Sequence, residues 1–112
     1  TPDDQLEAAV ADAPFDLVVC GHTHVQVDRR LEGGRRLVNA GSVGRPYEGM
    51  QGAFWALLGD TIELLRTDYD VEEAASAILA SGYPDAADHA GQLLDPPGAG
   101  EVSVYFESLR GA

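Results

Sequence analysis

A short apolar run that stops at a glycine constrains this chain more than any other feature. The run Leu17-Val18-Val19-Cys20 follows a helical pattern and ends abruptly at Gly21. Such a run is typical of a strand that is covered on both faces in an α/β sheet, so we expect Cys20 to be a buried packing residue. In α/β sheets, functional residues gather at the carboxyl ends of strands. The segment after Gly21 is therefore the first candidate for a site.

The remaining elements follow from periodicity and turn residues. Apolar side chains at helical spacing predict helices, and apolar runs around glycine turns predict hairpins. We expect helices over residues 2–12, 71–81 and 85–94, the first capped by Thr1. We expect one hairpin from strands 25–31 and 36–39, and a second from strands 51–58 and 61–66. Between the hairpins, residues 40–49 hold three glycines and a proline, which indicates a loop.

With 112 residues the chain has room for one core. We expect residues 1–94 to form the domain, and residues 95–112 to be a linker and tail with a possible strand at 102–106. The chain opens without an initiator methionine or a recognisable targeting segment. We therefore expect it to be part of a longer natural protein.

The net charge excludes some classes of function. Seven basic and nineteen acidic residues give a formal charge of −12, which opposes general binding to nucleic acid or to an anionic membrane. No apolar run approaches the roughly 20 residues that cross a bilayer. The single cysteine cannot form an intrachain disulfide. We expect a cytoplasmic protein with no membrane partner.

The segment Gly21-His22-Thr23-His24 is the strongest chemical signal. In extended backbone, side chains at positions i and i+2 project to the same side, so His22 and His24 can address one metal or two adjacent ones. Gly21 would allow a sharp turn close to an ion. The alternative is that both histidines are ordinary turn residues, and an isolated pair would favour that alternative. The next motif reverses the preference.

The second motif is Asn39-Ala40-Gly41-Ser42-Val43-Gly44-Arg45-Pro46, one hairpin after the first. Together the two motifs resemble the end of the calcineurin-like metallophosphoesterases, in which a Gly-His-x-His segment is the last metal-binding motif and an Asn-Ala-Gly-Ser or Asn-Pro-Gly-Ser loop follows. The small bacterial phosphoesterase branch fits best. The resemblance covers Asp16 to about Arg66.

This resemblance implies a fold, a chemistry and a set of residues. The fold would be α/β, with residues 1–94 as the C-terminal part of a four-layer αββα sandwich. His22 would bind one metal and His24 the other, with Gly21 shaping the turn and with Asn39, Gly41 and Ser42 lining or supporting the adjoining loop. Two ions roughly 3.5 to 4 Å apart can activate a hydroxide for attack on phosphorus. Imidazoles suit divalent Mn, Fe, Zn, Co or Ni.

The same comparison identifies missing parts. The earlier family motifs, which carry the bridging aspartate and most other ligands, cannot be read in this chain. The bridging aspartate and the general acid are therefore expected upstream. The chain would need an N-terminal half, or a complementing chain, to complete the centre.

We thus expect a metal-dependent phosphoesterase acting on phosphomonoesters or phosphodiesters. The alternative is a non-catalytic metal-binding or regulatory module that needs a partner chain, and a third reading is purely structural. The sequence leaves the substrate, the native metal, the oligomeric state and the role of residues 95–112 open.

Three further residues carry weaker expectations. Arg45 would either contact a substrate phosphate or stay solvent-exposed or paired with Glu48. Tyr47 is expected to cap the core in preference to stacking on a substrate base. His89 is expected to be a solvated surface histidine.

Overall fold

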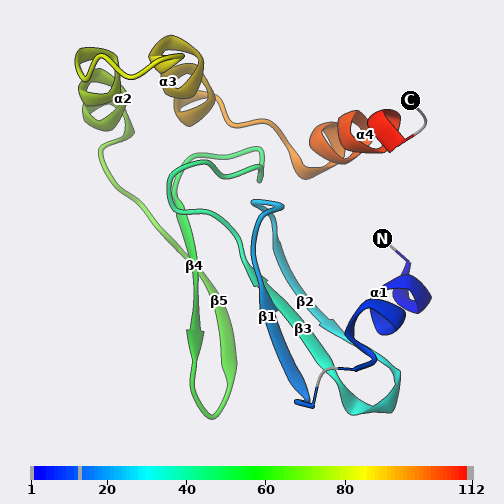
Figure 1. The fold of residues 1–112 in the computed structure, drawn as a ribbon. Helices are drawn as coiled ribbons and strands as arrows, with labels where there is room; N and C mark the ends of the chain where they lie inside the picture. The colour runs from blue at the N-terminus through cyan, green and yellow to red at the C-terminus, as the bar shows by residue number, and fades with distance from the viewer. Residues whose placement is uncertain (1, 13, 111–112) are drawn as a thin grey trace.

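The computed structural model describes residues 2–12 and 14–110 and shows a mixed α/β arrangement (Figure 1). The expected helices and hairpins are confirmed to within about two residues at each end. In chain order the elements are α1 (Asp3–Val10), β1 (Leu17–Cys20), β2 (Gln26–Arg30), the 3-10 turn Glu32–Gly34, β3 (Arg36–Ala40), β4 (Ala53–Leu58), β5 (Ile62–Thr67), α2 (Val71–Ala80), α3 (Ala86–Leu94) and α4 (Ala99–Arg110). Thr1, the expected cap of α1, lies outside the described residues.

Two small sheets form the centre of the molecule. The first has the strand order β1-β3-β2, in which β1 runs parallel and β2 antiparallel to β3. The second is the antiparallel pair β4-β5. In the parallel pair, Cys20 lies opposite Asn39. The loops that follow β1 and β3 therefore leave the first sheet side by side, at the carboxyl ends of both strands.

Gln26 of β2 connects the two sheets. Its side-chain amide donates to the carbonyls of Trp55 in β4 and Leu65 in β5, at 3.0 and 2.9 Å. The backbone N–H of Phe54 also donates to the Ser42 carbonyl at 3.1 Å. These bonds fix β4 against the loop that follows β3.

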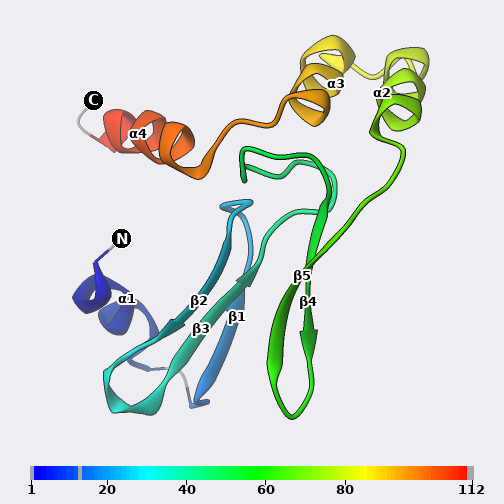
Figure 2. The same ribbon diagram turned by 180° about the vertical axis from the view of Figure 1, so that it is seen from behind.

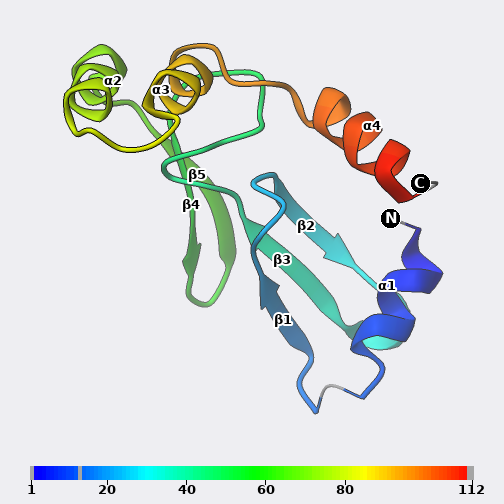
Figure 3. The same ribbon diagram turned by 45° about the horizontal axis from the view of Figure 1, so that its top comes forward.

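The helices lie at the periphery of the sheets. Figures 1 and 2 show α2 and α3 packed together beyond the ends of β4 and β5, with α1 and α4 on the opposite side of the molecule. Figure 3 shows α1 and α4 along the β2 side of the three-stranded sheet. The loops after β1 and β3 thus lie between two groups of helices.

The expectation for the C-terminal segment is wrong. Residues 99–110 form helix α4, so they are neither a linker nor a strand at 102–106. Val102, Tyr105, Phe106 and Leu109 stand at the spacing i, i+3, i+4 and i+7, which one face of a helix requires. At 12 residues α4 is still short, and no helix in the described part of the chain is long and apolar enough to span a membrane.

The expected double burial of β1 is also wrong. Val19 is 50% exposed and Cys20 is exposed, whereas Val38 in the neighbouring strand β3 is fully buried. The reason is position in the sheet, since β1 is an edge strand and β3 is central among the described strands. The apolar run correctly indicated a strand, but the described residues leave most of that strand exposed.

Candidate metal centre

The two histidines of the Gly-His-Thr-His segment lie in the loop between β1 and β2. Both have left-handed backbone conformations, with φ of 77° at His22 and 61° at His24, so the expected extended backbone is wrong. The sharp turn lies at the histidines, while Gly21 has no positive φ and a Cβ there would meet nothing within 4 Å. His22 and His24 nevertheless face one cavity of about 730 Å³.

Asn39 holds the two loops together. Its side chain is almost fully buried, and its amide nitrogen donates to the Gly21 carbonyl at 3.1 Å and to the Thr23 hydroxyl at 2.9 Å. Its amide oxygen accepts from the Gly41 N–H at 2.9 Å. Asn39 therefore fixes the histidine loop against the loop that follows β3.

His24 is oriented by the second loop. Its Nδ1 lies 2.8 Å from the Arg45 carbonyl oxygen. Because a carbonyl can only accept, Nδ1 carries a proton, and we assign the neutral ring to the tautomer whose Nε2 keeps the lone pair. This is the arrangement in which a metal-binding histidine uses Nε2 as ligand and Nδ1–H as anchor.

Tyr47 packs on the same imidazole. The two rings are stacked, with centroids 4.8 Å apart and an interplanar angle of 25°, and the Tyr47 N–H donates to the His24 carbonyl at 3.0 Å. Tyr47 is half-buried. Its ring therefore supports His24, and Tyr47 also lines the histidine cavity.

Gly41 and Ser42 support the loop from behind. Gly41 has φ of +84°, and a Cβ there would lie 2.8 Å from the Gln26 side chain and 3.1 Å from Phe54. The Ser42 hydroxyl accepts from the Arg45 N–H at 2.9 Å. Neither residue lines the cavity with the histidines.

Arg45 turns its side chain away from that cavity and toward α3. Its Nε donates to Gln92 Oε1 at 2.6 Å, and its terminal nitrogen lies 3.7 Å from the Asp88 carboxylate. Glu48, the partner considered from the sequence, instead accepts from the Gln26 N–H at 2.5 Å. The guanidinium is thus bound by α3 in this structure.

Three further residues line the histidine cavity and were not predicted there. Cys20, expected in the core, lines it, and so do Val102 and Phe106 of α4. The helical spacing of apolar residues in α4 was a readable signal. Nothing in the sequence indicates that Cys20 is exposed, because the burial of an edge strand depends on what covers the sheet.

The donor set fits a divalent metal in part. Two imidazoles, one with its Nδ1 already bonded to a carbonyl, suit a borderline ion. Among residues 2–12 and 14–110, however, no three His, Cys, Asp or Glu side chains gather as a metal cluster. The described residues thus bring two imidazoles to one cavity.

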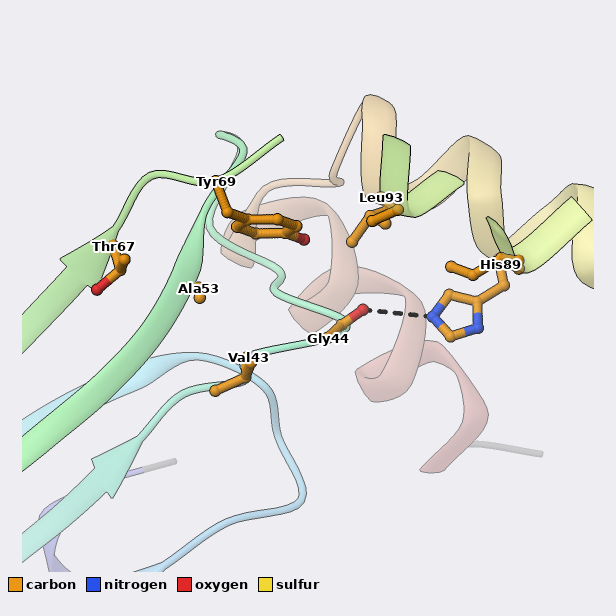
Figure 4. Close-up of a pocket in the computed structure, with 9 residues that line it drawn as sticks. Val43, Gly44, Ala53, Thr67, Tyr69, His89 and Leu93 are labelled. Carbon is orange, nitrogen blue, oxygen red and sulfur yellow. Dashed lines mark hydrogen bonds between the residues drawn. The ribbon is translucent and has the colours of Figure 1, made fainter. Parts of the chain in front are cut away.

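A second cavity, of about 370 Å³, is lined by residues of the loop after β3, of β4 and β5, and of helices α2 and α3 (Figure 4). Its lining includes Val43, Tyr69 and Leu93, and burial raises the pKa of Tyr69. His89 of α3 also lines it and is half-buried, contrary to a fully solvated position. Its Nε2 donates to the Gly44 carbonyl at 3.3 Å, as Figure 4 shows.

The chain is similar to known proteins in sequence and in fold. Residues 1–61 match the model of the calcineurin-like phosphoesterase superfamily domain. An uncharacterized protein of Methanocaldococcus jannaschii is 28% identical over an alignment that covers 62% of this chain and 36% of that protein. The crystal structure of a hypothetical protein from Pyrococcus horikoshii superposes with a TM-score of 0.71 at 18% identity, covering 88% of this chain and 39% of that one.

The chain thus spans less than two fifths of the length of both relatives. The likeness to the Pyrococcus horikoshii structure shows that the fold is shared. The Gly-His-Thr-His segment and the loop after β3 both lie within the residues that the family model matches. Members of the superfamily generally use divalent metals. Since the family model matches more than half of the residues, the chain belongs to the calcineurin-like phosphoesterase superfamily.

Proposed function

We propose that this chain supplies the last metal-binding motif of a dinuclear, metal-dependent phosphoesterase that hydrolyses phosphomonoesters or phosphodiesters. His22 binds one ion and His24 the other. The bridging aspartate, the general acid and the other ligands come from an N-terminal half or from a complementing chain.

One observation carries this proposal. The Nδ1 of His24 is bonded to the Arg45 carbonyl, so Nε2 is the nitrogen that keeps a lone pair in the neutral ring, and His22 and His24 line one cavity. Superfamily membership adds independent support for hydrolysis of a phosphate ester.

When bound, the ions would supply a nucleophilic water and offset the charge that develops on the phosphoryl oxygens. This chain's own residues position that chemistry. Asn39 keeps the histidine loop at a fixed distance from the loop after β3, and Tyr47 restricts the rotation of the His24 ring. Rigid placement of ligands lets an active site hold two ions with little reorganisation.

A second candidate function rests on the ligand count. Because the described residues gather only two imidazoles, a non-catalytic metal-binding or regulatory module that borrows ligands from a partner chain is also consistent with the donor set. The two functions differ in turnover, since a module binds metal without hydrolysing a phosphate ester.

The test uses the natural full-length protein with His22→Asn and His24→Asn variants. Asparagine removes the imidazole and tolerates the left-handed backbone that both positions require. We expect hydrolysis of p-nitrophenyl phosphate and bis-p-nitrophenyl phosphate in Mn²⁺ to fall by about 100-fold or more, with little change in the thermal midpoint. Metal content by mass spectrometry should fall in parallel.

Glu63→Gln is the matched control, because Glu63 is exposed on β5 and does not line the histidine cavity. It should keep both metal and turnover. Unchanged turnover in both histidine variants contradicts the phosphoesterase proposal. Metal binding that depends on the histidines in a wild-type protein without turnover favours the regulatory module.

A further inference from the structure

We propose that helix α3 is a positioning element for the metal ligand His24, acting through Arg45. The inference rests on the proposed role of His24 as a ligand. Its central contact is the hydrogen bond from Arg45 Nε to Gln92, which we call the Arg45 clamp. The clamp holds the Arg45 carbonyl where it selects the tautomer of His24.

Arg45 makes contacts in two directions. Its backbone carbonyl accepts from His24 Nδ1 at 2.8 Å, and its side chain reaches Gln92 of α3 at 2.6 Å. One residue thus joins the imidazole to a helix residue that lies 47 positions further along the chain. This contact links the position of α3 to the residue whose carbonyl accepts from the imidazole.

The contact to Gln92 is the stronger of the two contacts that the guanidinium makes with α3. A short hydrogen bond from a charged donor contributes more than a neutral one. The ion pair with Asp88 is longer, at 3.7 Å, and the Asp88 side chain is 68% exposed, so water screens it. Gln92, by contrast, is half-buried.

The residues on either side of Arg45 restrict its backbone. Pro46 is fully buried, and a residue that precedes proline is restricted to extended conformations. On the other side, His89 of α3 donates to the Gly44 carbonyl at 3.3 Å. The loop is thereby attached to α3 at two successive residues, as Figure 4 shows for Gly44.

Local bonds offer a competing explanation for the position of the carbonyl. The Tyr47 N–H donates to the His24 carbonyl, and the Ser42 hydroxyl accepts from the Arg45 N–H. If these two bonds are sufficient, removal of the clamp leaves His24 unchanged. The experiment has to separate the two cases.

The test compares Gln92→Met with Gln92→Glu in the natural full-length protein. Methionine keeps the length of the side chain and removes the acceptor, whereas glutamate keeps an acceptor for Arg45 Nε. The readout is the ¹⁵N shift of the His24 ring nitrogens in metal-free, histidine-labelled protein, with the signal assigned by its loss in His24→Asn. The tautomer is therefore observed without metal or turnover.

We expect a second tautomer of His24 to become populated in Gln92→Met and not in Gln92→Glu. The Kd for Mn²⁺ should rise by about 10-fold in the methionine variant and return toward the wild-type value in the glutamate variant. The ¹⁵N shifts of His22, which has no contact with the clamp, should not change. Gln5→Met, at an exposed position on α1, is the control for loss of an amide.

An unchanged His24 tautomer in folded Gln92→Met overturns the inference, whatever the metal affinity does. A changed tautomer together with a wild-type protein that shows no hydrolysis keeps the clamp and removes the phosphoesterase proposal. If Gln92→Met does not fold, Gln92→Asn is measured in the same way. Asparagine shortens the side chain by one methylene and so withdraws the acceptor oxygen from Arg45. A changed tautomer in Gln5→Met would also contradict the clamp.

Discussion

At the scale of single residues, the histidine loop stores backbone strain. His22 is exposed and has φ of 77°, a conformation that costs an L-residue about 1 to 2 kcal/mol. Strain of this kind concentrates at functional sites, where side-chain chemistry outweighs backbone preference. A glycine at position 22 would relieve the strain and remove the ligand.

This strain predicts an inverted order of stability at position 22. We expect His22→Gly to have a free energy of unfolding about 1 kcal/mol higher than that of His22→Ala, because only glycine adopts the left-handed conformation without a Cβ penalty. At an unstrained position alanine is the more stable of the two. Urea unfolding of both variants measures the difference, and an alanine variant of equal or greater stability would show that the backbone is not strained.

Asn39 predicts a larger effect, since its side chain is buried and holds two loops. Asn39→Leu would leave the Gly41 N–H and the Gly21 carbonyl without their present partner. We expect the free energy of unfolding to fall by about 2 to 3 kcal/mol in urea titrations. Gln5→Leu, at an exposed position, should change it by less than about 0.5 kcal/mol. Equal values for the two variants would refute the structural role of Asn39.

Residue type and spacing singled out His22, His24 and Asn39, and the structure brings these three residues to one cavity. The contacts of Arg45 with Gln92, and of Tyr47 with His24, were not predicted, because they join segments that only the tertiary fold brings together.

At the scale of elements, periodicity explains what could be predicted. The hairpins and the first three helices follow from local apolar patterns and turn residues, which depend little on distant contacts. Helix α4 was missed because Gly98 and Gly100 suggested a linker, although the spacing of Val102 and Phe106 is helical. The burial of β1 was overestimated because an apolar strand does not by itself specify its cover.

The hairpin of β2 and β3 carries an ion pair with a predictable pH dependence. Asp28 accepts two hydrogen bonds from Arg36, at 2.8 and 2.6 Å. These bonds and the positive charge of Arg36 hold the pKa of Asp28 below its ordinary value of 3.8. The charged form of Asp28 is therefore favoured in the folded state. At pH values above the ordinary pKa of 3.8, the ion pair stabilises the hairpin.

We expect this stabilisation to be lost as the pH falls from about 3.8 through the lower folded-state pKa of Asp28. The difference in unfolding free energy between wild type and Asp28→Asn should be constant near neutral pH and should shrink in acid. Urea unfolding at a series of pH values measures it. Glu63→Gln serves as the control, and a difference that is independent of pH would mean that the ion pair does not contribute.

At the scale of the whole molecule, the chain exposes more surface than a compact protein of its size. Its accessible surface is 7402 Å², whereas a compact monomer of 112 residues exposes about 5,900 Å². Its radius of gyration is 16.2 Å, against about 13 Å for a compact domain. The excess includes apolar side chains on β1 and α4, among them Leu17, Val19, Tyr105 and Phe106.

We expect further polypeptide to cover this exposed apolar surface. The outer edge of β1 has no strand partner among the described residues, and exposed apolar edge strands pair readily with other chains. We expect an N-terminal part, or a complementing chain, to pair with β1 and to bring the remaining metal ligands to the carboxyl end of that strand. Hydrogen exchange at the Val19 amide should be fast in the 112-residue chain alone and at least about 100-fold slower in the natural full-length protein.

The same comparison gives a second readout and a control. The 112-residue chain alone should bind the dye ANS and unfold over a broad range of urea, since its apolar surface is incompletely buried. The amide of Val38, in the buried central strand β3, should be protected more than that of Val19 in both forms wherever the first sheet is folded. A monomeric 112-residue chain that unfolds cooperatively, binds no dye and protects Val19 as fully as Val38 would contradict the expectation, because β1 would then need no further cover.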